Sequence, residues 1–105
     1  MEGSVCVITV KRNDIKASIA NTPFHSLEHM FHIEAPNSKG ESLITGEMVL
    51  LEQEVPAVTN HLTSSGIVVS AVHSHWLYDN PKLMYIHLLS IGSAEKFAEV
   101  ISKLV

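Results

Sequence analysis

The sequence predicts an α+β fold, with a mainly antiparallel β-sheet and helices on one face. Short apolar segments rich in β-branched residues recur along the chain and are separated by turn residues, as in a sheet of short strands. Two other segments, 52–65 and 93–104, carry the signals of helices. Residues 46–105 therefore read as a β-α-β-β-α unit, and the whole chain, 1–105, fits one domain.

The N-terminal part of the chain predicts one long strand and leaves one segment open. Residues 3–11 alternate as a strand does, 12–14 form a turn, and 15–20 make a short partner strand. Residues 22–35 fit two patterns, because their apolar residues follow helical spacing while the stretch HMFHIEA also suits a strand. Residues 36–41 form a loop.

Each of the two helices has its own start signal. The helix over 52–65 begins with acidic residues, has Pro56 near its start and is stopped by Gly66. Ser93 caps the last helix. The apolar stripe of that helix consists of Ala94, Phe97, Ala98, Ile101 and Leu104.

Composition excludes several classes of function. Hydrophobic residues make up 46% of the chain, enough for a packed core. The formal net charge is -4 without any basic run, which argues against nucleic acid or an anionic membrane as partner. The single cysteine, Cys6, cannot form an intrachain disulfide, and the apolar N-terminal stretch is too short for a signal peptide. We therefore expect a cytoplasmic protein.

Three of the seven histidines stand in a predicted hairpin of strands 67–77 and 83–91. His73 and His75 point to the same face, because successive strand side chains alternate. If Leu77 faces Leu83 across the short turn, His87 lies opposite His73 on that same face. The three imidazoles are then close enough to share one metal ion, although hydrogen bonds to the backbone, Ser74 or Tyr85 also account for them.

A carboxylate ligand is expected from the segment before the helix. Strand 46–51, the helix and strand 67–77 form a crossover that makes the two strands parallel, so the ends that carry Glu54 and His73 meet at one edge. We therefore prefer Glu54 as the fourth ligand, with Glu52 second and Glu47 third. Three imidazoles and a carboxylate suit Zn²⁺, Fe²⁺, Mn²⁺ or Ni²⁺.

Two further patterns are interpreted as structural. His25-Ser26-Leu27-Glu28-His29 matches the H-x-x-E-H string of inverted zinc peptidases, but as a helix it is more simply the wet face of an amphipathic segment. Trp76 has the opposite parity to His73, so we expect it to pack under the helices.

The chain from Gly46 onward resembles the LppY/LpqO-like family, bacterial domains without an established function. The matching motifs are Gly46-Glu47, LLEQEV at 50–55, Gly66-Ile67, AVHSHWL at 71–77, Pro81, YIH at 85–87 and Gly92. Departures are Ser74, where Asn is typical, and Pro56 directly after Val55. The resemblance implies functional roles for the residues already selected, and it suggests a homodimer because family members often carry the module twice.

The sequence thus predicts a small metal-binding domain with His73, His75, His87 and Glu54 as ligands. The metal would activate water or polarise a substrate oxygen, in hydrolytic or oxygen chemistry, with Glu52 as a general base. Whether the chain is an enzyme stays open, and the sequence names no small-molecule ligand. One alternative is a non-catalytic, ligand-binding or regulatory homodimer whose histidines line a pocket. The other is a structural module with internally bonded histidines.

Overall fold

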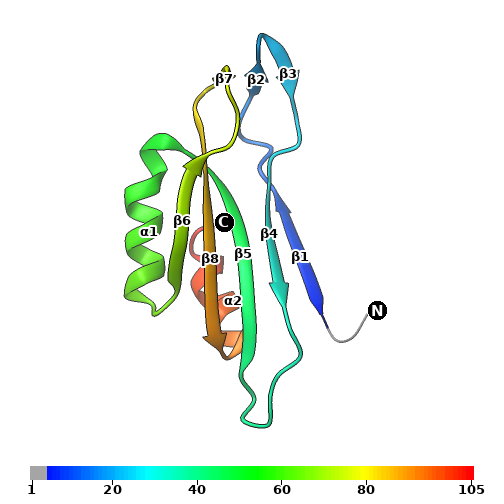
Figure 1. Ribbon diagram of the computed structural model, residues 1–105, viewed down its shortest axis with the longest axis vertical. Coiled ribbons are helices and arrows are strands. Elements are labelled where there is room, and N and C mark those ends of the chain that lie inside the picture. The colour runs from blue at the N-terminus through cyan, green and yellow to red at the C-terminus, as the bar shows by residue number, and fades with distance from the viewer. Residues whose placement is uncertain (1–4) are drawn as a thin grey trace.

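The computed structural model describes residues 5–105, so the first residues of the predicted strand 3–11 lie outside the described part. Within it, five strands form one antiparallel sheet in the order β1-β4-β5-β8-β6 (Figure 1). The strands of this sheet are β1 (Cys6–Lys11), β4 (Glu28–Ile33), β5 (Ser42–Leu51), β8 (Leu83–Gly92) and β6 (Val68–Ser74). The predicted α+β class is confirmed, and the β-α-β-β-α order appears as β5, α1, β6, β8 and α2.

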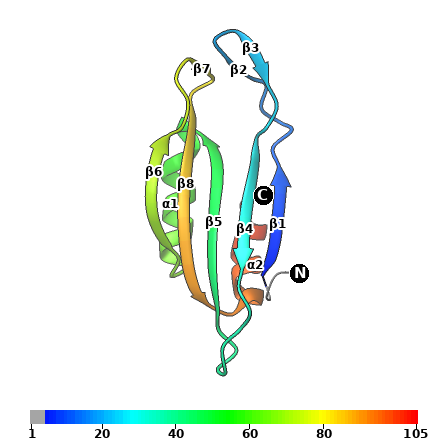
Figure 2. The ribbon, with the colours of Figure 1, turned by 45° about the vertical axis from the view of Figure 1, so that its right-hand side comes forward.

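Helices α1 (Val55–Ser64) and α2 (Ala94–Ser102) both cover one face of this sheet, and Figure 2 shows them behind the strands. The main core lies between this face and the two helices. Alternate residues of β5 and β8 point into it from the sheet. Leu62 of α1 and Phe97 and Ile101 of α2 complete it. The full buried cluster is Phe31, Ile44, Met48, Leu50, Leu62, Ile67, Ile86, Leu88, Phe97 and Ile101. We call the opposite face the open face.

A second, small sheet caps the open face at its upper end in Figure 1. It consists of β2 (Ala17–Ile19), β3 (Thr22–Phe24) and β7 (Asp79–Asn80), in the order β3-β2-β7. A separate apolar cluster fills the space beneath it, with Tyr85 and Val49 contributed by the large sheet. Trp76 belongs to this cluster, where its ring meets Phe24 edge-on at 5.4 Å.

Gly46 in β5 leaves space that two core side chains occupy. A Cβ atom at this position would lie 2.5 Å from Cδ1 of Phe31 and 3.1 Å from Cδ1 of Leu88. Phe31 is 2% exposed and packs edge-on against Phe97 at 5.6 Å, so its ring has little room to withdraw. Glycine is therefore required here for packing rather than for a turn.

The structure corrects several of the predicted elements. The ambiguous segment 22–35 forms strands β3 and β4, which rules out the helical face for its histidines. The strand over 46–51 begins earlier, at Ser42, and the helix is preceded by a 3₁₀ turn, η1 (Glu52–Glu54). Strand 67–77 ends at Ser74, so Trp76 does not follow its alternation and packs on the open face. Cys6 is exposed.

The predicted hairpin register is also wrong. His87 lies opposite Ala71, and His73 lies opposite Tyr85, two residues away from the predicted pairing. A bulge at Ser70 shifts the pairing by one residue between Val69 and Ala71. Both β5 and β6 run antiparallel to β8, which lies between them, so β5 and β6 are parallel to each other as expected.

No helix in the described part of the chain is long and apolar enough to cross a membrane.

Candidate metal centre

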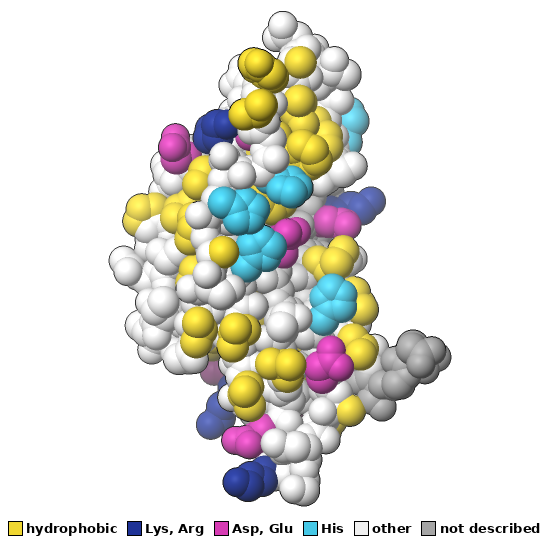
Figure 3. Space-filling model, in the orientation of Figure 1, with side chains coloured by type: hydrophobic (Ala, Val, Ile, Leu, Met, Phe, Trp, Pro, Cys, Tyr) yellow, Lys and Arg dark blue, Asp and Glu magenta, His cyan; other side chains and the backbone are white. Residues whose placement is uncertain are grey.

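The open face brings together His73 at the end of β6, His87 in β8 and Glu47 in β5. Glu47 is the direct cross-strand partner of His87, so both side chains leave the sheet on the same side. The bulge in β6 places His73 on this side as well. Histidine side chains gather near the middle of this face, with apolar side chains below them (Figure 3).

His73 and His87 are in direct contact. Their Nε2 atoms are 2.9 Å apart, and their ring centroids lie 4.9 Å apart with an angle of 25° between the ring planes. Nδ1 of His73 lies 3.1 Å from the carbonyl oxygen of Ser74, to which it donates a hydrogen bond. This contact puts the proton of the neutral ring on Nδ1, so the lone pair of His73 Nε2 points to His87.

Glu47 is the carboxylate nearest to this histidine pair. Its Oε2 atom lies 3.7 Å from Nε2 of His87, beyond hydrogen-bond distance. Both side chains are 40% exposed, so each has room to change rotamer. The sequence placed Glu47 third because it assumed that β5 and β6 are neighbours. The structure inserts β8 between them and moves Glu47 to the level of His87.

His75 lies just past the end of β6, at the border between the histidines and the small sheet. Its ring centroid is 6.0 Å from that of His73 and 4.9 Å from that of Tyr85. It meets the ring of Trp76 edge-on at 4.4 Å. Trp76 Nε1 donates a 3.4 Å hydrogen bond to the Tyr85 hydroxyl, whose pKa is raised by burial. His75 is thus close to the histidine pair but turned toward the aromatic rings.

The structure brings Glu54, the preferred ligand in the sequence, to Arg12 instead. The two Glu54 carboxylate oxygens accept hydrogen bonds of 2.6 and 3.1 Å from Arg12, and Oε1 also accepts one of 2.7 Å from the Leu51 N–H. The hydrogen bond from Arg12 is the main reason that the pKa of Glu54 lies below its usual value. The 3₁₀ turn folds Glu54 back in this way. Glu52 is exposed on the same turn, and within residues 5–105 no contact joins it to the three histidines.

As the side chains stand, no three His, Cys, Asp or Glu groups among residues 5–105 converge closely enough to hold a metal ion. Two imidazoles are in place, while Glu47 and His75 would have to turn toward them. The arrangement therefore supplies donors of the right type but not a closed site.

A shallow hollow of about 320 Å³ continues the site across β5 to β4. Its lining includes Glu47 and His87 and adds Met30, His32 and Thr45. His32 and Met30 reach the open face because β4 is a strand with alternating sides. The alternation of side chains in EHMFHI indicated a strand that would bring His32 and Met30 to one face. The same segment also fits a helical pattern, so the sequence did not decide between the two.

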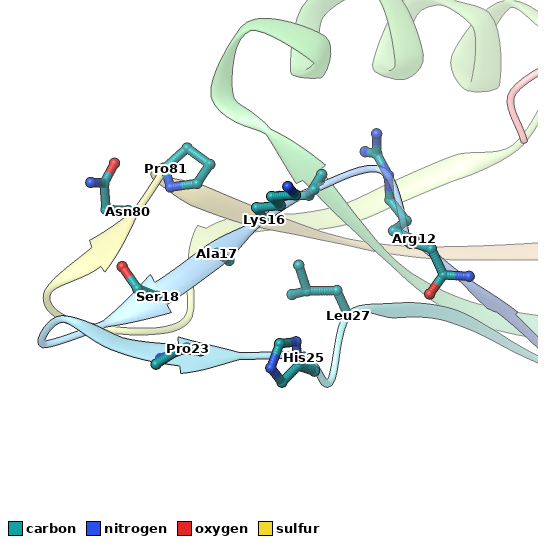
Figure 4. A pocket seen from close by; sticks show the side chains of 11 residues that line it. Arg12, Lys16, Ala17, Ser18, Pro23, His25, Leu27, Asn80 and Pro81 are labelled. Carbon is teal, nitrogen blue, oxygen red and sulfur yellow. The ribbon is translucent and has the colours of Figure 1, made fainter.

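A larger cavity than this hollow lies elsewhere. It has a volume of about 640 Å³ and lies between the small sheet and the chain that leads into β2, with Lys16, His25 and Leu27 among the lining side chains (Figure 4). None of His73, His75, His87 and Glu47 lines it. Lys16 and His25, two of its polar lining residues, are exposed to solvent. We therefore do not choose this cavity as the functional site on its volume alone.

Comparison with known proteins identifies a family. The sequence model of a family described as "Domain of Unknown Function (DUF1259)" matches residues 1–105. No curated protein and no solved structure matches the chain.

Proposed function

This chain belongs to the family described as "Domain of Unknown Function (DUF1259)", and we propose that it binds one divalent metal ion on the open face of its sheet. His73 and His87 are the first two ligands, Glu47 is the carboxylate, and His75 is the third imidazole. Three of these four residues are those expected from the sequence. Glu47 replaces Glu54, whose oxygens are engaged by Arg12.

The observation that carries this proposal is the 2.9 Å separation of the two Nε2 atoms. Two nitrogens bound to one ion at about 2.1 Å stand about 3.0 to 3.4 Å apart, for bond angles between right-angled and tetrahedral, so the observed separation lies close to the right-angled end of this range. The hydrogen bond from His73 Nδ1 to the Ser74 carbonyl supports this reading, because metal-binding histidines usually donate their other N–H in this way. A direct N–H···N hydrogen bond between the two imidazoles gives the same separation. Measuring the metal content of the protein distinguishes this hydrogen bond from a shared ion.

Glu47 and His75 are exposed enough to turn toward an ion that His73 and His87 hold. Glu47 and His87 are each 40% exposed, and His75 is exposed at the strand end. Neither Glu47 nor His75 makes a hydrogen bond to another side chain in the described residues that binding would break. Nitrogen and oxygen ligands of this kind suit Zn²⁺, Fe²⁺, Mn²⁺ or Ni²⁺.

A ligand or substrate would approach along the hollow beside Glu47 and His87. A bound ion with an open coordination position activates water or polarises a carbonyl or phosphoryl oxygen. His32 and Thr45 border the same hollow and offer polar contacts to a small molecule. The single cysteine agrees with the reducing cytoplasmic setting expected from the sequence.

The test is elemental analysis of untagged protein purified without chelators. We expect near-stoichiometric metal in the parent and in His25→Ala, which removes an exposed histidine far from the site. The double variant His73→Ala/His75→Ala should lose the metal. Glu47→Gln should bind more weakly by about tenfold or more, while Glu54→Gln should bind as the parent does once folding is verified by circular dichroism.

Absence of metal from the parent, even after incubation with Zn²⁺, Mn²⁺, Fe²⁺ and Ni²⁺, would overturn the proposal. Metal that is retained in the double variant would place the binding site elsewhere. Loss of metal in Glu54→Gln but not in Glu47→Gln would restore the carboxylate preferred from the sequence.

A second candidate function is a ligand-binding or regulatory homodimer without metal. Several apolar side chains of the open face are exposed, and a second copy of the chain would cover them. These side chains are Val7, Leu43, Val68 and Ile91, with exposed fractions between 44% and 66%. The resemblance to LppY/LpqO-like domains, which often carry the module twice, points the same way. Sedimentation of metal-free protein, beside Ile91→Lys, distinguishes a dimer from a monomer.

A further inference from the structure

A separate cavity of about 420 Å³ lies on the helix side of the sheet, away from the histidine site. It is bounded by the ends of β1 and β5, by the start of α1 and by the segment after α2. Its apolar walls are formed by Val10, Leu50, Ala57, Val58 and Leu104. A volume of this size lies within the range of small-molecule sites in proteins, about 300 to 1,000 Å³.

His29 places one buried polar group on this cavity. The residue is 3% exposed, and its Nδ1 accepts a 3.2 Å hydrogen bond from the Val49 N–H. Burial lowers the pKa of His29 to about 4, so the ring is neutral near pH 7. With Nδ1 acting as acceptor, the proton of the neutral ring is on Nε2.

The Nε2–H group of His29 has no hydrogen-bond acceptor among residues 5–105. Among these residues Asp79 Oδ1 is the one fully buried side-chain polar atom without a hydrogen-bond partner, so His29 Nε2 is accessible to solvent although the residue as a whole is buried. His29 is itself one of the residues that line the cavity, so a molecule in the cavity can supply the missing acceptor.

The charges around the cavity indicate what kind of acceptor fits. The five N–H groups of Arg12 are directed to Asp14, Glu54 and the Val49 carbonyl oxygen. Asp14 and Glu54 line the cavity too, and the other cation on its lining, Lys11, is exposed. An anionic ligand would therefore meet two carboxylates without an unengaged buried cation, whereas a neutral oxygen meets no such repulsion.

We propose that this cavity binds a small, mostly apolar molecule with one neutral oxygen acceptor, such as a ketone or an amide, which accepts a hydrogen bond from His29 Nε2–H. The apolar walls enclose the body of the molecule, and the single donor fixes its orientation. This site does not depend on the proposed metal centre, since the two lie on opposite faces of the sheet.

The test uses two pairs of probes that differ in one atom group. Cyclopentanone and cyclohexanone carry the acceptor, whereas methylenecyclopentane and methylenecyclohexane have nearly the same shape without it. Binding is followed by chemical shifts of ¹⁵N-labelled, metal-free protein, including the imidazole signals of His29. We expect saturable shifts at Val10, Leu50 and Val58 with at least one ketone, and about tenfold weaker binding of its methylene analogue.

Two variants locate the binding. Ala57→Phe places a large side chain on the cavity wall and should weaken ketone binding about tenfold or more, because it fills the space. Ala98→Phe makes the same change on an exposed position of α2 outside the cavity and should bind as the parent does. Both variants are checked first for a parent-like spectrum away from the substitution.

Three results would overturn the proposal. Neither ketone produces saturable shifts up to its solubility limit, which would mean that only water occupies the cavity. A ketone and its methylene analogue bind equally, so that the hydrogen bond from His29 has no role. Ala57→Phe binds like the parent, so that the molecule occupies another part of the surface.

Discussion

At the scale of single residues, Val49 explains why the polar side chains of His29 and Arg12 lie against the sheet. The pairing of β4 with β5 ends at Met30 and Glu47, after which the two strands separate. The backbone of Val49 then lacks a strand partner on that side. His29 Nδ1 accepts its N–H at 3.2 Å, and Arg12 Nη1 donates to its carbonyl oxygen at 3.3 Å. Side chains thus replace the missing strand.

This role of His29 predicts a pH dependence of stability. The pKa of His29 is about 4 in the folded protein, mainly because of burial, and about 6.5 in the unfolded chain. The unfolded state therefore binds more protons between these values, and stability falls as the pH drops below about 6.5. We expect His29 to account for a loss of about 2 kcal/mol between pH 7.5 and pH 5.

The measurement is urea denaturation at both pH values, with chelator present, for the parent and for His29→Gln. Glutamine still offers an oxygen to the Val49 N–H but does not titrate, so the variant should lose less stability on acidification. Asp14 and Glu54 have lowered pKa values and stay ionised at pH 5, so they contribute little to the difference. If the parent and His29→Gln lost the same free energy of unfolding between pH 7.5 and pH 5, the pKa of His29 would not be lowered by folding, and this prediction would be wrong.

At the scale of elements, strand alternation explains why His73 and His87 share one face of the sheet although the predicted register was wrong. The actual pairing of β6 with β8 differs from the prediction by two residues, which preserves the face of every side chain. The bulge at Ser70 matters for the same reason, since without it His73 would turn to the helix side. The sequence has no marker for this bulge, and only the turn length guided the predicted register.

The longer elements were predictable because their patterns extend over several residues, whereas of the small sheet only one strand, within 15–20, was predicted, and its pairing was not. Strands β2, β3 and β7 have two or three residues each, too few to establish an alternation. The ion pair of Arg12 with Glu54 joins two turns far apart in sequence, so it left no local signal. This pair is the physical reason why Glu54 does not reach the histidines.

Packing between β4 and β5 predicts a strong effect of Gly46→Ala. The new methyl group would lie 2.5 Å from the Phe31 ring, which Phe97 holds in place. We expect a loss of about 1–3 kcal/mol in the free energy of unfolding, as for other overpacked cores. Gly92→Ala is the matched control in β8, because its methyl group would meet no atom within 4 Å.

Urea denaturation of the two variants beside the parent tests this expectation. Gly92→Ala should be neutral or slightly stabilising, since alanine lowers the entropy of the unfolded chain. A Gly46→Ala protein as stable as Gly92→Ala would mean that the Phe31 ring moves aside at little cost.

At the scale of the whole molecule, the sheet has one covered and one open face, and the two proposed sites lie on different sides. The helix side contains the main core and the cavity at His29. The open side carries His73, His87 and Glu47 on three different strands. These three residues are far apart in sequence, so only the folded sheet brings them together.

A metal ion held by these strands should therefore stabilise the whole fold. A ligand that binds the folded state alone raises the free energy of unfolding by about 2.7 kcal/mol at 100 times its dissociation constant. We expect such a gain for the parent and for His25→Ala with the metal identified by elemental analysis, and its reversal by a chelator. His87→Ala should gain little, because one of the two imidazoles in contact is gone. A parent that binds metal without this gain would bind it equally well when unfolded, and the ligands would then be mobile side chains instead of a site built by β5, β6 and β8.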